Sequence, residues 1–370
     1  MGTGAAAAVF AGMALLNTAS GPMATLRNQP TATTAAVLTT SPSPGAPAPA
    51  STRAVSEGLV ALSATTAQGV RHGSGIAVAT GGLIATTVDV VLGATKLVAT
   101  EPSGHRERAR LVAYDRRSGV ALLRVPKAVP VPTFAGTRSL RPGTPAMVMA
   151  MDDGGASDAP AAARQRIGPG TRWTTALVQA AATPVRSGAA AGMTAIAASV
   201  PRWSPVAGEV LVSPDGVVIG MLDATSVPTG TSLTSTSTAA SSPTTSTAAS
   251  SPTATPPATF LPARLVTAVS EDLARWGRVR HGWLDVDAQD ATTPSGNPAG
   301  ALVVAVPRRG ASSGLLGAGD VIEAVEGAPV TSMAQLRERL YVLPAGTQVE
   351  LEITRHGTQT SAEVDLGSSP

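Results

Sequence analysis

The sequence predicts a mainly β protein with two small barrels in tandem, joined by a linker to a smaller α+β domain. Three observations support this fold class. The first half contains many short Val-rich runs separated by Gly and Pro. Aromatic residues make up only 2% of the 370 residues, so the cores must be built from aliphatic side chains. The last part of the chain mixes strand-like runs with one amphipathic helix.

The first 56 residues are predicted to lie outside the folded domains. Residues 4 to 16 form an apolar run of 13 residues, shorter than the roughly 20 needed to cross a bilayer. Residues 1–27 are therefore interpreted as a membrane anchor or a remnant of an export signal, with an Ala-rich tail as the alternative. The anchor is favoured because residues 28–56, rich in Pro, Thr and Ala, have the composition of a tether.

Residues 57–223 are predicted to form the two barrels. Two groups of closely spaced strands occur here with no helical period between them. The first set is "GLVAL", "GSGIAVA", "GLIATT", "TKLVAT", "RARLVAY" and "GVALLRV", and the second is "PAMVMAM", "RWTTALVQA", "GMTAIAA", "EVLVS" and "VVIGML". Two groups of about six strands each indicate two barrels.

The remaining segments are a linker, a connection and the α+β domain. Residues 224–259 are rich in Ser, Thr and Pro and are predicted to be a flexible linker. Residues 260–280 are expected to connect it, through a helix, to a domain at residues 281–366. The helix expected in this last domain has Ser332 as its N-cap. Its apolar face is formed by Met333, Leu336, Leu340 and Val342.

The composition argues against several classes of function. The net charge of +3 is spread along the chain without a basic stripe, which makes nucleic acid an improbable partner. The absence of cysteine excludes disulfides, thiol nucleophiles and zinc–thiolate sites. The four histidines, His72, His105, His281 and His356, are too scattered to form a metal site by spacing. The sequence therefore predicts no metal and no cofactor.

Several segments together resemble HtrA-type, trypsin-like serine proteases, in their order and approximate spacing. They are "HGSGIAV", "GGLIATT", "YDRRSGVALLRV", "LRPGTPAMVMA" and "LVSPDGVVIGM". Residues 260–286 resemble the passage from the protease domain into a PDZ domain, and "GLLGAGDVIEAVEGAPV" resembles the most recognisable PDZ segment. The resemblance implies a chymotrypsin/trypsin-like double β-barrel followed by an α+β PDZ domain.

The resemblance also locates the positions of a Ser-His-Asp triad. The histidine position at the end of "LIATTVDVV" is Asp89, and the aspartate position two residues before "ALL" is Gly119. The nucleophile lies eight residues before the turn residue Asp215, which places it at Ala207. None of the three groups that this mechanism needs is present. Asp89 itself is interpreted as a partly exposed carboxylate at a strand end, paired with a nearby arginine.

A fourth position that the resemblance locates supplies a backbone N–H group to the oxyanion hole. The family's oxyanion hole uses the N–H two residues before the nucleophile, and Pro205 in that place has none. Ser204 is the nearest alternative nucleophile, but it is three residues from the expected position and precedes a proline. His72 and His105 have no catalytic partners at a recognisable spacing in the sequence, and they are interpreted as surface or turn residues.

The PDZ resemblance places a peptide-binding loop at Leu284, Asp285 and Val286. Such loops capture a C-terminal carboxylate with backbone N–H groups, and Asp285 replaces their central Gly. Its negative charge is expected to repel that ligand. The alternative is a displaced loop in which Asp285 points into water. Addition of an internal strand remains open in either case.

The favoured hypothesis is a non-catalytic HtrA-like protein outside the cytoplasmic membrane, binding polypeptide partners through its PDZ domain as a scaffold or regulator. The alternative is an active serine endopeptidase of envelope protein quality control with a rearranged site, for which Ser204 is the first candidate. A third hypothesis is a structural envelope protein that self-associates, since the resemblance implies trimers.

Overall fold

The computed structural model describes residues 50–137, 140–151, 165–168, 170–185, 190–201, 205–223 and 257–368. All of them belong to one compact unit, residues 42–370. Among these residues no helix is long and apolar enough to span a membrane. The apolar run at residues 4 to 16, Ser204 and most of both predicted linkers lie outside the described residues.

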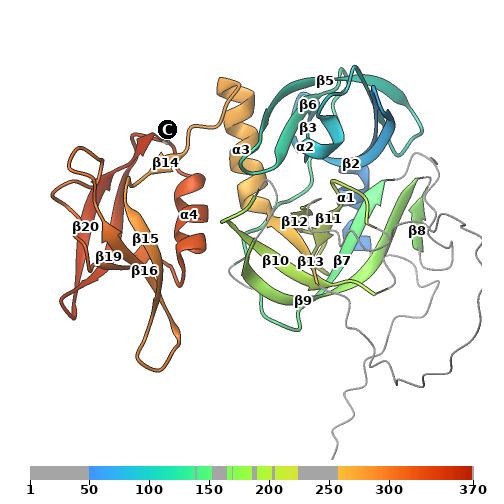
Figure 1. Ribbon diagram of the computed structural model, residues 1–370. Helices are drawn as coiled ribbons and strands as arrows, with labels where there is room; N and C mark the ends of the chain where they lie inside the picture. The colour runs from blue at the N-terminus through green and yellow to red at the C-terminus, as the bar shows by residue number, and fades with distance from the viewer. Residues whose placement is uncertain are drawn as a thin grey trace, which may run out of the picture. The chain divides into compact units, whose positions relative to one another are not determined.

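The first barrel is closed and six-stranded, in the order β1-β2-β3-β6-β5-β4 (Figure 1). Each strand contains one of the predicted runs. The strands are β1 (Leu59–Thr66), β2 (Gly69–Ala79), β3 (Leu83–Thr87), β4 (Lys96–Thr100), β5 (Arg106–Asp115) and β6 (Val120–Arg124). A one-turn helix, α2 (Val88–Val91), follows β3 directly. All pairings are antiparallel, as the closely spaced strands predict.

The second barrel contains six strands in the order β10-β13-β12-β11-β7-β9, and the pairing of β9 with β10 closes it. Strand β8 extends the sheet beside β9. The strands are β7 (Pro145–Met151), β8 (Gln165–Gly168), β9 (Thr171–Pro184), β10 (Thr194–Ser199), β11 (Val210–Val212), β12 (Val218–Leu222) and β13 (Ala258–Pro262). The predicted fold class of two barrels and a smaller domain is confirmed.

Strand β13 corrects a predicted boundary. The sequence places residues 258 and 259 in the linker and the rest of β13 in the connecting segment, but β13 pairs with both β10 and β12. Phe260 on this strand is fully buried among the apolar side chains of the second barrel. The barrel is therefore completed by a strand that follows the Ser/Thr-rich segment, because a barrel needs this strand to satisfy the edges of its neighbours.

The predicted N-terminal linker also ends earlier than expected. The helices η1 (Ala50–Thr52) and α1 (Arg53–Gly58) occupy the residues before β1. Val55 is fully buried in the core, and the Ser51 hydroxyl donates a hydrogen bond to the carbonyl of Pro214 at 2.9 Å. These contacts order residues whose composition alone suggests a tether.

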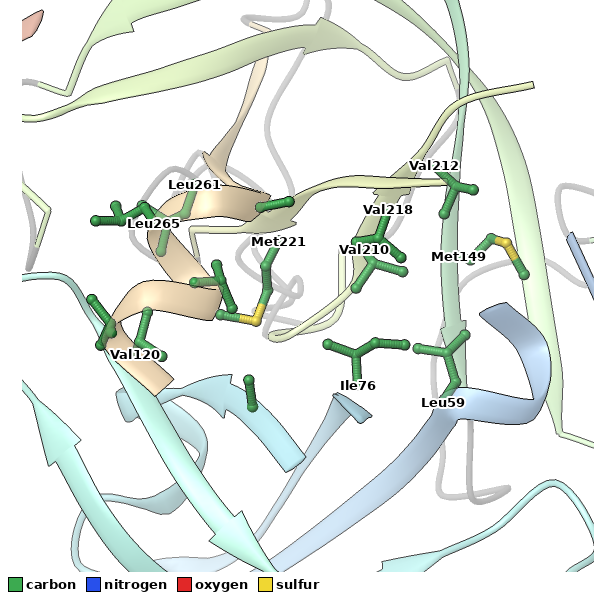
Figure 2. Close-up of a cluster of buried hydrophobic side chains, with 14 of the residues drawn as sticks. Leu59, Ile76, Val120, Met149, Val210, Val212, Val218, Met221, Leu261 and Leu265 are labelled. Carbon is green, nitrogen blue, oxygen red and sulfur yellow. The ribbon is translucent and has the colours of Figure 1, made fainter. Parts of the chain in front are cut away.

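Helix α3 (Ala263–Trp276) follows β13 and packs on the barrels. Its buried side chains recur along one face, and Gly277 ends it in a left-handed conformation, with φ of 68°. Figure 2 shows Leu265 of this helix beside side chains of both barrels, among them Val120 and Met221. Burying each such side chain contributes about 1.5–3 kcal/mol, so this shared cluster joins the barrels and the helix into one core.

The C-terminal domain is a twisted antiparallel sheet with one helix beside it (Figure 1). The strands are β15 (Asp287–Thr292), β16 (Pro298–Ala305), β17 (Val321–Val325), β18 (Ala328–Pro329), β19 (Gln348–Arg355) and β20 (Thr358–Asp365), with β14 (Gly282–Trp283) paired separately to β21 (Gly367–Ser368). Helix α4 (Met333–Tyr341) confirms the predicted helix, and the Ser332 hydroxyl caps it by accepting from the N–H of Gln335 at 3.2 Å. Strand β21 extends the domain just beyond the predicted end at residue 366.

An ion pair fixes the turn before β17. The Asp320 carboxylate is almost fully buried and accepts two hydrogen bonds from Arg355, at 2.8 and 2.7 Å. It also accepts from the N–H of Gly317 at 2.8 Å. Hydrogen bonding to Arg355 is the main reason that the pKa of Asp320 lies below its usual value.

Candidate functional site

The structure brings Asp89 and Ala207 to one surface hollow of about 540 Å³. Asp89 comes from α2, and Ala207 from the turn that precedes β11. The remaining lining residues are Arg71, His72, Val90 and Leu92. Gly119 lies next to α2, because its carbonyl accepts a hydrogen bond from the N–H of Val88 at 2.8 Å. The three triad positions that the resemblance indicates therefore lie in one neighbourhood.

Asp89 differs from its expected setting. It is exposed on the one-turn helix α2, not at a strand end. The predicted arginine is present as Arg71, but its guanidinium donates to backbone carbonyls, those of Asp89 at 3.0 Å and Leu92 at 2.9 Å. Arg71 therefore caps the carbonyl end of α2 through these two hydrogen bonds. The short helix forms because its backbone groups find these partners.

His72 is a residue that the sequence reasoning left without a role. It lies on β2, exposed, and borders the hollow with Asp89 and Ala207. His105, by contrast, is in the turn before β5 and pairs with Glu107 at 3.0 Å, as a surface residue would. No spacing in the sequence connects residue 72 with residue 207, since these segments come together where β2 of the first barrel meets the turn before β11 of the second.

The backbone around Ala207 is held firmly. The N–H of Ser74 donates to the Ala207 carbonyl at 2.8 Å, and the Thr86 hydroxyl donates to the Ser74 carbonyl at 2.8 Å. Gly208 has φ of 81°, and a Cβ at that position would overlap the Ser74 carbonyl oxygen. Only glycine fits there. The turn thus has a defined geometry, while none of the six residues lining the hollow carries a hydroxyl or thiol.

A buried ion pair lies directly after this turn. Glu209 is 1% exposed and accepts a hydrogen bond from the guanidinium of Arg172 on β9, which is 7% exposed. The sequence reasoning missed this pair. The available signal was two opposite charges within otherwise apolar strand segments, but 37 residues separate them. A buried ion pair of this kind is stable only while both partners are present, because removing one leaves the other as an uncompensated charge in the interior.

The predicted peptide-binding residues border a second hollow, of about 260 Å³, which is lined by the C-terminal domain and by Arg117, Ala191 and Met193 of the barrels. Leu284 and Val286 are buried, while Asp285 is half-buried and has φ of 54°. A central position with positive φ is one that glycine adopts without strain, which agrees with the Gly expected there. From the other side of this hollow, α4 contributes Met333, Leu336, Arg337, Leu340 and Tyr341.

The loop at Asp285 is braced from a neighbouring turn. The Ser312 hydroxyl, fully buried, donates to the Leu284 carbonyl. The Asp285 carboxylate lies against Gly310, where an added Cβ would overlap it. The Asp285 side chain therefore contacts this turn, and Asp285 is one of the residues that line the hollow.

Polar contacts at α4 connect it to the barrels. The Tyr341 hydroxyl donates to the Asp115 carboxylate, and the Thr194 hydroxyl donates to Glu338 at 2.6 Å. Burial, reinforced by Asp115, raises the pKa of Tyr341 well above its usual value. The His281 ring lies 3.5 Å from the Tyr341 ring, and burial lowers the pKa of His281. The same burial favours the neutral form of the His281 imidazole.

Within the described residues, no group of three or more His, Cys, Asp or Glu side chains could hold a metal ion. The hollow beside Ala207 and the groove beside Asp285 are therefore considered by their protein groups alone.

Comparison with known families and structures agrees with this architecture. The Trypsin-like peptidase domain family matches residues 73–198, and the PDZ domain family matches residues 282–366. The first match includes Asp89 and Gly119 and ends before Ala207.

Curated relatives and solved structures give the same assignment. A probable periplasmic serine endoprotease DegP-like of Pseudomonas fulva is 34% identical over 117 residues, covering 30% of this chain and 24% of the relative. The periplasmic serine endoprotease DegP of Escherichia coli K12 is 25% identical over 311 residues, covering 80% and 57%. The chain thus spans only part of the length of these relatives.

Among solved structures, the HtrA-type protease AlgW with tripeptide has a TM-score of 0.59 at 20% identity, covering 86% of this chain and 96% of that one. The structure of AlgW with decapeptide gives 0.54 at 18% identity. These likenesses support the fold. By its matched domains and its relatives, the chain is of HtrA type, with a trypsin-like peptidase domain followed by a PDZ domain.

Proposed function

We propose that this chain acts by binding and not by hydrolysis, as an HtrA-like protein that holds protein or peptide partners as a scaffold or regulator. The observation that carries the proposal is Ala207 in the hollow, where the family's nucleophile is expected. A methyl group offers neither a lone pair to attack a carbonyl nor a proton to transfer.

The neighbouring groups support this proposal. Acyl transfer needs a base to take the nucleophile's proton and a carboxylate to orient that base. Asp89 and Gly119 stand at those two positions, and Pro205 has no N–H to stabilise an oxyanion. His72 supplies an imidazole at the hollow, but no lining residue supplies the hydroxyl that it would activate.

Binding activity is assigned to the PDZ domain. Its fold presents the outer edge of β15 and the backbone N–H groups of the loop at Asp285, the two elements that PDZ domains use to hold an extended segment. A polypeptide partner is therefore the proposed ligand.

The test is chemical labelling of the purified full chain. A fluorophosphonate probe should label no serine, and unfolded casein should remain intact over hours, with an active trypsin-like protease as positive control. Labelled serine identified by mass spectrometry, or casein fragments that a fluorophosphonate suppresses, would contradict the proposal.

The names of the relatives favour a second candidate, a working serine endopeptidase of protein quality control. Ser204 would then be the first residue to test. Under this alternative, any casein cleavage should disappear in Ser204→Ala and persist in Ser213→Ala, which removes a serine in the hairpin after β11.

We also propose an extracytoplasmic location, since the relatives are named as periplasmic. Fusion of the full chain to alkaline phosphatase, which is active only after export, would report it. A membrane tether and a homotrimer remain proposals from the resemblance, and the mass of the detergent-free protein in solution would test the trimer.

A further inference from the structure

The hollow beside Asp285, together with the outer edge of β15 and helix α4, forms what we call the PDZ groove. One wall of this groove is a strand edge that can pair with an extended chain. Strand β15 is at the end of its sheet and pairs only with β16. Its other edge can hydrogen-bond a segment that adds as a further strand. Across the groove, Met333, Leu336 and Leu340 of α4 provide apolar side chains. A segment bound here would place alternate side chains against this helix.

The groove is tied together at the end away from the loop. The N–H of Met333, the first residue of α4, donates to the Asp290 carboxylate on β15 at 2.7 Å. This bond holds the two walls at a fixed spacing and occupies the Asp290 carboxylate. Recognition by a free charge must therefore come from the opposite end, at Asp285.

The charged groups that border the hollow differ in whether they already have partners. Arg337 donates to the carbonyl of Gly192 at 3.2 Å. The positive charge of Arg117 lowers the pKa of both Tyr341 and His281, so Arg117 belongs to the charge cluster around Asp115. Within the described part of the chain, the Asp285 carboxylate has neither a hydrogen bond nor an ion pair, although it is half-buried. Arg117 and Arg337 keep their positive charges, so Asp285 is the acidic group of this lining that a basic ligand side chain can meet.

The loop that carries Asp285 also controls where this carboxylate points. Its backbone is left-handed at Asp285, the Ser312 hydroxyl holds the Leu284 carbonyl, and Gly310 leaves space only for the carboxylate. A free C-terminus bound by the N–H groups of the loop would meet this negative charge at short range. A Lys or Arg side chain at the same place would be attracted by it.

We propose that Asp285 is a specificity-determining residue, which makes the groove select an internal polypeptide segment with a Lys or Arg side chain over the loop and reject a free C-terminal carboxylate. The inference rests on the proposed function, because it assumes that the PDZ domain binds a polypeptide. It adds the chemical class of that polypeptide.

The experiment uses two phage libraries against the full chain, one displaying internal segments and one displaying free C-termini. The wild-type protein should enrich Lys or Arg at one fixed position of internal segments. Asp285→Gly should instead enrich free C-termini, because it restores the uncharged loop. The best internal segment, measured as a fluorescent peptide by anisotropy, should bind Asp285→Asn about tenfold or more weakly, since an unscreened contact pair of charges is removed.

Asp365→Asn is the matched control. Asp365 is an exposed carboxylate on β20, at the opposite end of the sheet from β15, and does not border the hollow. This variant should keep the wild-type affinity for the selected peptide. Circular dichroism of each variant should match the wild type, which removes misfolding as an explanation.

Wild-type selection of free C-termini, or equal binding of the selected peptide by Asp285→Asn, would overturn the inference. Enrichment from neither library by any of the proteins would also overturn it, because the groove would then not be a docking site. Each of these results is independent of the fluorophosphonate and casein assays. A chain without hydrolytic activity whose groove binds C-termini would keep the proposed function and lose only this inference.

Discussion

The hollow beside Ala207 and the groove beside Asp285 have both kept a backbone framework, but they differ in how their side chains depart from the family's pattern. In the hollow, the turn around Gly208 is held by Ser74, and none of the lining residues carries a hydroxyl or thiol. In the groove, the loop is braced by Ser312, and a carboxylate has been added to it.

This difference matters because the two sites rely on different chemical groups. Hydrolysis depends on side chains, so three substitutions are enough to remove it. Binding of an extended segment depends mainly on backbone N–H and C=O groups, which substitution leaves in place. A domain pair of this type is therefore expected to lose catalysis while it retains binding, with altered specificity.

The largest expected effect concerns the buried ion pair beside the hollow. Glu209→Gln should lower the free energy of unfolding by about 3–5 kcal/mol, because it removes the carboxylate charge that compensates the buried guanidinium of Arg172. Urea unfolding followed by circular dichroism measures this. The double variant Glu209→Leu with Arg172→Met should recover most of the loss. A cost below about 1 kcal/mol for Glu209→Gln would show that water reaches the pair, and the framework of the hollow would be less rigid than that of the groove.

The next effect tests whether the hollow still contains the geometry of an active site. Asp89→His, Gly119→Asp and Ala207→Ser together restore the three side chains, but the variant should remain slow because Pro205 lacks an N–H. Adding Pro205→Gly should raise casein hydrolysis by about 10²- to 10³-fold, the usual value of one oxyanion donor. Equal rates for the triple and quadruple variants would place Pro205 outside the oxyanion position.

A smaller effect is expected from the ion pair inside the PDZ domain. Asp320→Asn should cost about 1–3 kcal/mol, because it weakens the buried hydrogen bonds to Arg355 and Gly317. The pKa of Asp320 is lower in the folded state, so its contribution is complete above the usual value of 3.8 and disappears as the pH falls through the folded-state pKa. Acid titration of stability should show this loss in the wild type and much less of it in Asp320→Asn. Identical acid profiles would exclude the contribution.

The smallest expected effect is a gain in stability. Asp285→Gly should raise the free energy of unfolding by about 0.5–1 kcal/mol, since glycine adopts φ of 54° without the steric cost of a side chain. Thermal unfolding of the PDZ transition measures it. Ala in the same position should give no gain, and a loss in the glycine variant would mean that the Asp285 carboxylate stabilises the loop through its contact with Gly310.

Short-range information in the sequence was sufficient for most of the fold. Alternation and turn residues predicted the strands from Leu59 to Leu222 except β8, and the pattern of Ser332 and the apolar residues after it predicted α4. The spacing from the turn at Asp215 placed Ala207 next to the hollow that also contains Asp89. These features depend on residues close together in the chain.

Tertiary structure decided the features that depend on distant residues. Strand β13 belongs to the second barrel because β10 and β12 have edges to pair, although its own segment resembles a connection. His72 lies at the hollow because the two barrels meet there, and Arg172 lies beside Glu209 because segments of the second barrel pack together. The orientation of Asp285 depends on space at Gly310, which no local pattern contains. Sequence by itself determined which chemical groups stand at the positions that the resemblance indicates, and the tertiary structure decided which of the chain's groups meet, because such contacts depend on packing between segments far apart in the chain.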